Sequence, residues 1–266
     1  MKPPYEITKK ILRLATSISE KLGEINAVHL EKSSPELRRQ NRIKTIQSSL
    51  AIEGNTMDEE QITALLENKH VVAPLKDITE VRNAIAVYEK LKKFDPFSIK
   101  SLCDAHKILM SGLMASPGKL RGKPVGIVHG SQLAHLAPPG EMVKPLLTDL
   151  FDYVKKDEDI ILIKSCVFHY EFEFIHPFLD GNGRMGRLWQ TVLLKNQYPV
   201  FEFLPVETLI KTNQSVYYNT LQQSDKTGQS TPFIEFMLEI IEASLASLLP
   251  SQGKTLSGID RINLFK

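Results

Sequence analysis

Apolar residues recur every three or four positions over most of the chain, which is the pattern of amphipathic α-helices. One predicted helix begins at Ser34-Pro35, because serine caps free amides and proline fits the first turn of a helix. It should end near Glu53-Gly54-Asn55, where glycine permits a left-handed exit. The first predicted helix, from Tyr5 onward, carries the stripe Ile7, Ile11, Leu14, Ile18, Leu22 and Ile25.

The same spacing continues toward the C-terminus. Thr56 and Glu59 have the spacing of a capping box and predict the start of a third helix. Residues 250–266 are polar and contain two glycines, which is typical of a tail or linker. The predicted fold class is all-α. Further helices are expected at about 77–93, 98–113, 141–153 and 161–174, and from about 184, 207 and 231 onward.

One segment departs from the helical pattern. Between Gly122 and Pro139, two short apolar runs at 125–128 and 133–136 flank His129-Gly130-Ser131, a sequence typical of a turn. These runs predict a small, exposed β-hairpin. A lone hairpin is marginally stable, so we expect this one to need a partner.

Composition narrows the class of protein. The 33 basic and 31 acidic residues leave a formal net charge of +2, which gives no electrostatic reason to bind nucleic acid or a membrane. No apolar stretch is long enough to cross a bilayer, and the start, MKPPYEITKK, lacks the apolar run of a signal peptide. Cys103 and Cys166 lie in apolar helical patterns and are expected to be reduced core residues. These features predict a soluble, cytoplasmic protein.

The segment that most clearly indicates catalytic or binding chemistry reads IHPFLDGNGRMGRL, residues 175–188, and lies between two apolar helices. His176 precedes Pro177, whose ring disfavours helical geometry in the residue before it, so the histidine should end a helix and turn outward. An imidazole that titrates near ~6.5 suits proton transfer at neutral pH, although a histidine at a helix end is, taken alone, more often structural. Phe178 and Leu179 should anchor the loop in the core.

The second half of this segment predicts an anion site. Asp180 can hold Mg²⁺, which prefers one or two carboxylates plus phosphate oxygens, or it can simply cap the loop. Gly181-Asn182-Gly183 lets successive amides point into one concavity before a helix N-terminus. Arg184 and Arg187 are three residues apart and share a helix face, where they can bind phosphates together. Gly186 costs up to about 1 kcal/mol relative to alanine, which suggests a packing or functional reason for it.

The run from His176 to Arg187 resembles the signature HPFxDGNGRxxR of the Fic family at every fixed position. The resemblance extends over the flanking helices and the hairpin, so it covers most of the chain. It implies a Fic-type helical bundle with a small β-hairpin flap. The implied division is into N-terminal helices at 1–110 with an inhibitory helix at about 35–54, a Fic core at 111–249 with the flap at about 122–137, and a polar tail at 250–266.

This resemblance implies a protein adenylyltransferase. Such an enzyme transfers AMP from ATP to a hydroxyl side chain of a target protein or of itself, and it releases diphosphate. His176 would be the general base, and Asp180 would hold Mg²⁺, for which Mn²⁺ can substitute. A target protein is expected to dock on the flap by edge pairing. The implied nucleotide-binding residues of the motif are Gly181, Asn182, Gly183, Arg184, Gly186 and Arg187.

A shorter match lies upstream, where Ser49-Leu50-Ala51-Ile52-Glu53-Gly54 resembles the inhibitory motif of Fic proteins. Ser49 and Glu53 are four residues apart and share a helix face. A carboxylate at a helix C-terminus is disfavoured by the helix dipole and favours a cation, which the family supplies as the second motif arginine, here Arg187. If Glu53 pairs with Arg187, ATP cannot bind productively. The alternative is an exposed terminal glutamate.

Several alternatives stay open from sequence. Tyr217 and Tyr218 resemble residues that line the adenine pocket in Fic proteins, but they are equally compatible with core aromatics, and Asp225 departs from the asparagine common near its position. Fic-like chains can instead transfer UMP, phosphocholine or phosphate. The chain can also be a nucleotide-sensing regulatory module or part of a DNA-binding regulator, although an intact His176 and Asp180 argue against a purely regulatory role. Removal of AMP and a homodimer are both compatible with the sequence.

Overall fold

The computed structural model describes residues 2–27, 34–129 and 132–249. Within these ranges the protein is all-α, as the apolar spacing predicted, apart from two short strands. The 3₁₀-helices are η2 (Leu91–Lys93) and η3 (Pro199–Glu202). The α-helices are α1 (Lys9–Ala27), α2 (Pro35–Ile52), α3 (Glu59–Leu66), α4 (Leu75–Glu89), α5 (Ile99–Leu109), α6 (Gly140–Lys156), α7 (Ile161–Ile175), α8 (Asn182–Gln197), α9 (Val206–Thr212), α10 (Gln214–Thr227) and α11 (Thr231–Ala246).

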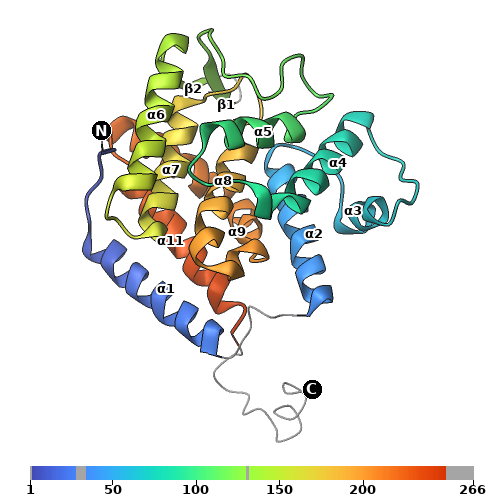
Figure 1. The fold of residues 1–266 in the computed structure, drawn as a ribbon, viewed down its shortest axis with the longest axis horizontal. Coiled ribbons are helices and arrows are strands. Elements are labelled where there is room, and N and C mark those ends of the chain that lie inside the picture. The colour runs from blue at the N-terminus through green and yellow to red at the C-terminus, as the bar shows by residue number, and fades with distance from the viewer. Residues whose placement is uncertain (1, 28–33, 130–131, 250–266) are drawn as a thin grey trace, which may run out of the picture.

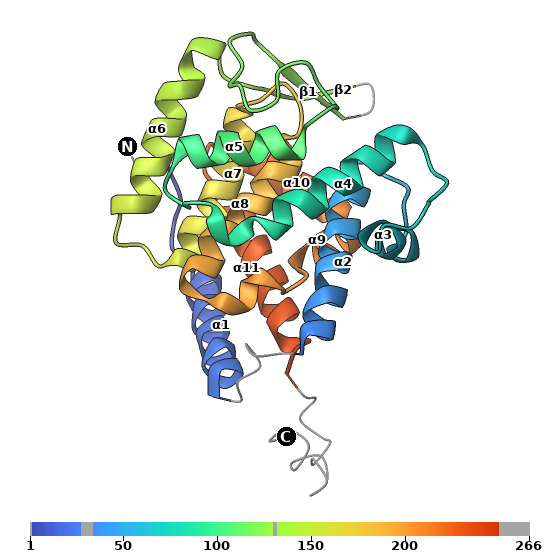
Figure 2. The same ribbon diagram turned by 45° about the vertical axis from the view of Figure 1, so that its right-hand side comes forward.

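Helices α7 and α8 run through the middle of the molecule and pack on each other (Figures 1 and 2). On one side of this pair lie α2, α3 and α4, and on the opposite side lie α1 and α6. Most side chains of α7 are buried, which matches its nearly continuous apolar sequence. Helix α2 packs against α9 and α4, so its C-terminal end reaches the N-terminal end of α8. The helices therefore bring two distant parts of the sequence to one place.

The predicted hairpin is present. Strands β1 (Gly126–His129) and β2 (Gln132–Leu136) pair antiparallel, with Gly126 opposite Leu136 and an irregularity between Ile127 and Val128. The two strands lie at the same end of the molecule as α5 (Figure 2). Residues 130–131 of the predicted turn and the predicted tail at 250–266 lie outside the described residues.

The predicted capping signals are partly right. The Ser34 side chain accepts a hydrogen bond from the Leu37 amide at the start of α2, and Gly54 leaves that helix with a φ of 89°. The predicted capping box of Thr56 and Glu59 is wrong. Helix α3 is capped by Asp58 and Gln61, whose side chains each accept a hydrogen bond from the other's amide.

Thr56 does not cap α3 because it forms hydrogen bonds with a residue of α4 instead. Its amide and its hydroxyl both donate to Oδ2 of Asp77 on α4, at 3.0 and 2.7 Å. A tertiary contact between two residues 21 positions apart thus replaces the predicted local cap.

Helix boundaries differ from the prediction in several places, and the helix expected at about 77–93, for example, ends at Glu89. The first helix begins at Lys9 rather than Tyr5, and α5 ends at Leu109 rather than near Leu113. The segment from 207 onward forms two helices, α9 and α10, because the chain turns at Asn213. Cys103 and Cys166 carry free thiols, as expected. Among the described helices, none combines the length and the apolar composition needed to cross a bilayer.

Candidate active site

The motif loop begins where α7 ends. His176 is the C-cap of α7 and has left-handed backbone angles, φ 49° and ψ 61°, and its amide donates to the Phe172 carbonyl. A non-glycine residue in this region is uncommon and costs conformational energy, which is a recurring feature of functional sites. The half-buried His176 therefore ends the helix, as Pro177 predicted, in a strained geometry that its surroundings must hold.

Arg121 holds this end of α7 and was not predicted. Its buried guanidinium donates to the carbonyls of Ile175 at 2.9 Å and His176 at 2.6 Å. It also donates to the carbonyls of Lys123 and Pro138, both at 2.8 Å, on the two segments that lead into and out of the hairpin. One side chain thus fixes the backbone of His176 and joins it to the base of the hairpin.

The loop after His176 is locked by Asn182. Its side-chain oxygen accepts from the Phe178 amide and its nitrogen donates to the Phe178 carbonyl, both at 2.9 Å. Phe178 is buried, as predicted, and stacks on His106 with ring centroids 3.7 Å apart. The prediction that Leu179 also anchors the loop is wrong, because its side chain faces solvent and the residue is 53% exposed. Asn182 therefore shapes the loop with its side chain.

His106 supports the loop from α5. Its Nδ1 accepts from the Gly118 amide at 2.8 Å, so the ring carries its proton on Nε2, which donates to the Asp180 carbonyl at 2.9 Å. Burial lowers the pKa of His106, which favours this neutral form. Gly181 lies beside it with a φ of 83°, and a Cβ there would lie 2.7 Å from the sulfur of Met110. Glycine is required at that position by both conformation and space.

Asp180 presents the exposed carboxylate of the site. Its side chain is 62% exposed, and its Oδ1 accepts from the Gly181 amide at 2.6 Å and from Arg184 at 3.3 Å. Nowhere in the described ranges do three or more His, Cys, Asp or Glu side chains gather closely enough to hold a metal ion. One carboxylate is nevertheless a sufficient protein ligand for Mg²⁺ when phosphate oxygens and water complete its octahedral shell.

Arg187, one turn into α8, meets the end of α2. Its side chain is 1% exposed and lies 2.7 Å from Oε1 of Glu53, and it also donates to the hydroxyl and the carbonyl of Ser49 at 3.1 and 2.9 Å. Burial lowers the pKa of Arg187, but the charge and hydrogen bond of Glu53, together with the nearby Tyr217 and Glu173, outweigh burial and raise it. The contact expected between Glu53 and Arg187 is present.

Gly183 makes this contact sterically feasible. A Cβ at Gly183 would lie 2.6 Å from Oε1 of Glu53 and 3.2 Å from Arg187. Two carbons or a carbon and an oxygen do not approach this closely without displacement. The carboxylate of Glu53 therefore occupies the space that a side chain at the second residue of α8 would fill.

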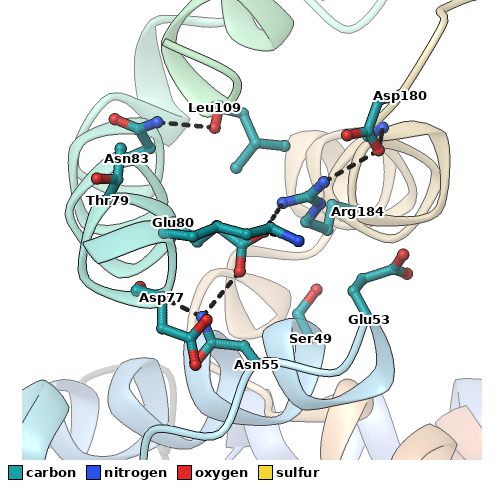
Figure 3. A network of polar contacts seen from close by, with 12 residues as sticks. Ser49, Glu53, Asn55, Asp77, Thr79, Glu80, Asn83, Leu109, Asp180 and Arg184 are labelled. Atoms are coloured by element: carbon teal, nitrogen blue, oxygen red, sulfur yellow. Dashed lines mark hydrogen bonds and ion pairs between the residues drawn. The ribbon is translucent and has the colours of Figure 1, made fainter. Parts of the chain in front are cut away.

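Arg184 is also paired, and its partner was not predicted. Its guanidinium lies 3.0 Å from Oε1 of Glu80 on α4, and these side chains are only 5% and 6% exposed. Figure 3 shows Glu80 between Arg184 on one side and Asn55, just beyond the end of α2, on the other. Asn55 donates to Oε2 of Glu80 at 2.8 Å. Both motif arginines therefore contact carboxylates from the N-terminal helices.

Gly186 and Tyr217 lie on the core side of α8. A Cβ at Gly186 would lie 2.6 Å from Glu173 and 3.0 Å from His169, so this glycine permits close packing of α8 on α7. Tyr217 is 1% exposed, its hydroxyl lies 3.0 Å from His169, and it packs in the aromatic core, whereas Tyr218 is half-buried. In this structure Tyr217 is thus a core aromatic, and a role for either tyrosine in adenine binding stays a prediction.

Comparisons with known proteins agree with this geometry. Residues 96–194 match the model of the Fic/DOC family. A Fic family protein from Desulfovibrio desulfuricans G20, solved by crystallography, has a TM-score of 0.90 and 42% sequence identity over 100% of this chain and 86% of that chain. Fic-1 from Caenorhabditis elegans (residues 134–508) has a TM-score of 0.68 at 20% identity, over 88% of this chain and 72% of that one, which concerns the fold alone.

Among curated proteins, the chain is 28% identical over 254 residues to protein adenylyltransferase fic-1 of Caenorhabditis elegans, covering 90% of this chain and 47% of that protein. Protein adenylyltransferase Fic of Drosophila erecta is 28% identical over 249 residues, with 88% and 47% covered. The chain thus spans about half the length of the curated relatives it matches. The motif geometry, the family match and the 42% identical crystal structure together show that this chain belongs to the Fic family.

Proposed function

We propose that this protein is an adenylyltransferase that transfers AMP from ATP to a hydroxyl side chain of a target protein or of itself. The proposal rests on the loop from His176 to Arg187, which ends in two arginines on one face of α8. Relatives at 28% identity bear the name protein adenylyltransferase. The reaction is an in-line attack of the hydroxyl oxygen on the α-phosphorus of ATP, in which the bond to the diphosphate breaks.

His176 is the proposed general base. It follows the last turn of α7 in a fixed left-handed conformation, and the Arg121 contacts hold its backbone. A base held in this way takes the proton from the attacking hydroxyl and contributes about 10²–10⁴-fold to the rate. The amides at the N-terminal end of α8, at Asn182 and Gly183, would stabilise charge on the phosphate oxygens, because a helix N-terminus favours anions.

Asp180 is the proposed ligand of Mg²⁺, for which Mn²⁺ can substitute. Its exposed carboxylate lies at the mouth of the loop and is the type of single ligand that Mg²⁺ takes together with phosphate oxygens. When bound, the metal would neutralise charge on the phosphates. Arg184 and Arg187 would bind the distal phosphates.

The observation that bears most directly on regulation is the contact between Glu53 and Arg187, 2.7 Å long with the arginine buried. An arginine in this contact cannot also hold a phosphate in the same direction, so Glu53 inhibits productive binding of ATP. Because the inhibitory carboxylate also lies over the N-terminal end of α8, at Gly183, it competes for the same anion-favouring space. Binding of a target on the hairpin edge, a homodimeric state and removal of AMP remain further parts of this proposal.

The proposal is tested by incubating the wild type, Glu53→Gly and His176→Ala with Mg²⁺ and either α-labelled or γ-labelled ATP, and by following protein-bound label. We expect incorporation from α-labelled ATP alone, more in Glu53→Gly than in the wild type and none in His176→Ala.

Other results would point elsewhere. Label from γ-labelled ATP would mean phosphate transfer, and competition by UTP or a phosphocholine donor would mean another transferred group. Absence of label from every variant, with retained nucleotide binding, would favour a regulatory module.

A further inference from the structure

Glu80 is a buried acid that the proposed reaction does not use. It lies on α4, 104 residues before Arg184, and its side chain is 6% exposed. Its Oε1 accepts from Arg184 at 3.0 Å, and its Oε2 accepts from the Asn55 amide group at 2.8 Å. Both oxygens of this carboxylate are therefore used, each by a donor from a different element (Figure 3).

Asn55 is itself fixed, so it sets the direction of the Glu80 carboxylate. The same Nδ2 that donates to Glu80 also donates to the Asp77 carbonyl at 3.2 Å, and Oδ1 of Asn55 accepts from the Met57 amide at 3.0 Å. Asn55 is buried. A carboxylate held at both oxygens cannot rotate without losing hydrogen bonds.

Arg184 has one fixed partner and one replaceable partner. The contact with Glu80 is the shorter and is buried on both sides, whereas the contact with Asp180, at 3.3 Å, joins it to a side chain that is 62% exposed. Separating Arg184 from Glu80 would leave a buried, unpaired charge, which is strongly unfavourable. Separation from Asp180 leaves a carboxylate in water. A phosphate arriving at Arg184 therefore replaces Asp180 and leaves the Glu80 contact intact.

The guanidinium has donors to spare for such a phosphate. It carries five N–H groups, and its contacts with Glu80 and Asp180 use one on Nη1 and one on Nη2. A second cation close to Glu80, Lys76, lies 3.9 Å away and is 73% exposed, so it is too solvated to hold the carboxylate. The position of Arg184 thus depends on Glu80.

We propose that Glu80 is a positioning residue that fixes Arg184 for the distal phosphates of the nucleotide. This inference rests on the proposed function. The inference can be distinguished from a simple counter-charge role, because removal of the acid should change the binding of distal phosphates in opposite directions in the two cases. Loss of a positioning acid weakens binding of distal phosphates, whereas loss of a competing acid strengthens it.

The test compares Glu53→Gly with Glu53→Gly/Glu80→Gln and measures the Kd for ATP and for AMP by calorimetry in the presence of Mg²⁺. Glutamine keeps the shape of the side chain but loses the charge. We expect the Kd for ATP to rise about tenfold, the size of one charge-assisted hydrogen bond, while the Kd for AMP, which lacks the distal phosphates, changes less than about twofold.

Three outcomes would overturn the inference alone: unchanged binding of ATP, tighter binding of ATP, or an equal loss for ATP and AMP. Failure of the Glu53→Gly parent to bind ATP would instead overturn the proposed function, and this inference with it. Glu89→Gln, an exposed acid on the same helix, is the matched control and should change neither Kd.

A second variant covers the case in which Glu80→Gln does not fold. Asn55→Ala, also in the Glu53→Gly parent, leaves the charge of Glu80 in place but removes the donor that holds its Oε2. We expect a smaller rise in the Kd for ATP, again without a change for AMP. An unchanged Kd for ATP in this variant would count against the positioning role.

Discussion

Arg184 and Arg187 lie three residues apart on α8 and are both buried, yet their ion pairs differ in construction. The partner of Arg187, Glu53, is the last residue before Gly54, and its side chain is 28% exposed. The partner of Arg184, Glu80, lies inside α4 and is 6% exposed. The first pair has water on one side and can separate, whereas the second is enclosed. Similar charges on neighbouring turns can therefore serve opposite purposes, one as a removable block and one as a fixed support.

The largest expected difference between the pairs is in stability. Glu80→Ala leaves a buried guanidinium without its main partner and should lower the free energy of unfolding by about 3 kcal/mol or more. Glu53→Ala should cost only about 1 kcal/mol, because water reaches that site and Ser49 keeps two hydrogen bonds to Arg187. Denaturant unfolding of both variants measures the difference. Equal losses would mean that the two pairs are equivalent.

One pH effect on stability is expected at Glu207. Glu207 on α9 is buried beside α2, and burial raises its pKa to about 7. The folded state then keeps a proton that the unfolded state releases above a pH of about 4.3, so stability falls as pH rises over that window and stays low above it. Glu207→Gln should be more stable than wild type by about 2 kcal/mol at a pH of about 8, with little gain at a pH of about 4.5.

Unfolding curves at several pH values measure this effect. Glu89→Gln, at an exposed acid on α4, provides the control. A gain of Glu207→Gln that is the same at every pH would contradict the assignment.

The close approach of Glu53 can be tested through two glycines of α8. Gly183→Ala places a Cβ 2.6 Å from Oε1 of Glu53 and should cost about 1 kcal/mol, and most of this cost should disappear in the Glu53→Ala background. Gly186→Ala meets Glu173 and His169 instead, so its cost should be the same in both backgrounds. Double-mutant cycles from denaturant unfolding provide the coupling energies. Equal coupling of both glycines to Glu53 would refute the contact.

The smallest effect is expected at the surface of the fixed pair. Lys76→Ala removes an exposed cation 3.9 Å from Glu80 and should change the free energy of unfolding by less than about 0.5 kcal/mol. The same unfolding assay checks this value at low and at high salt. A loss comparable with that of Glu80→Ala would mean that Lys76, and not only Arg184, holds the Glu80 carboxylate.

Much of the fold follows from local sequence signals. The apolar stripe of α1 from Ile11 onward, the serine-proline start of α2 and the Gly54 exit each depend on neighbouring residues, and all three are present. Ile7, predicted as the first residue of that stripe, lies before α1 and is 55% exposed. The contact between Glu53 and Arg187 was predictable for a different reason, because two separate motifs resemble those of one family. The chain turn at Asn213 left no comparable signal, so α9 and α10 were not separated.

The supporting residues of the site were not predictable in the same way. Glu80 looks like any acid on an amphipathic helix, and its partner is 104 residues away. Arg121 resembles a solvated loop cation, yet it is buried against four backbone carbonyls. Thr56 carried a capping signal that Asp77 overrode. Such contacts are set by the three-dimensional packing of helices, which no local window contains.

The position of Glu53 at the very end of α2 also has a kinetic consequence. Since α2 ends at Ile52, the Glu53 side chain can leave Arg187 by rotation about its own bonds while the helix stays folded. Such rotations of partly exposed side chains take nanoseconds or microseconds, whereas enzyme turnover commonly takes about a millisecond or longer. For the proposed transferase, the blocked and open forms would therefore equilibrate many times within each catalytic cycle. The reaction rate would follow the open fraction of the population, and a partner that shifts this equilibrium would change activity in proportion, without a slow activation step.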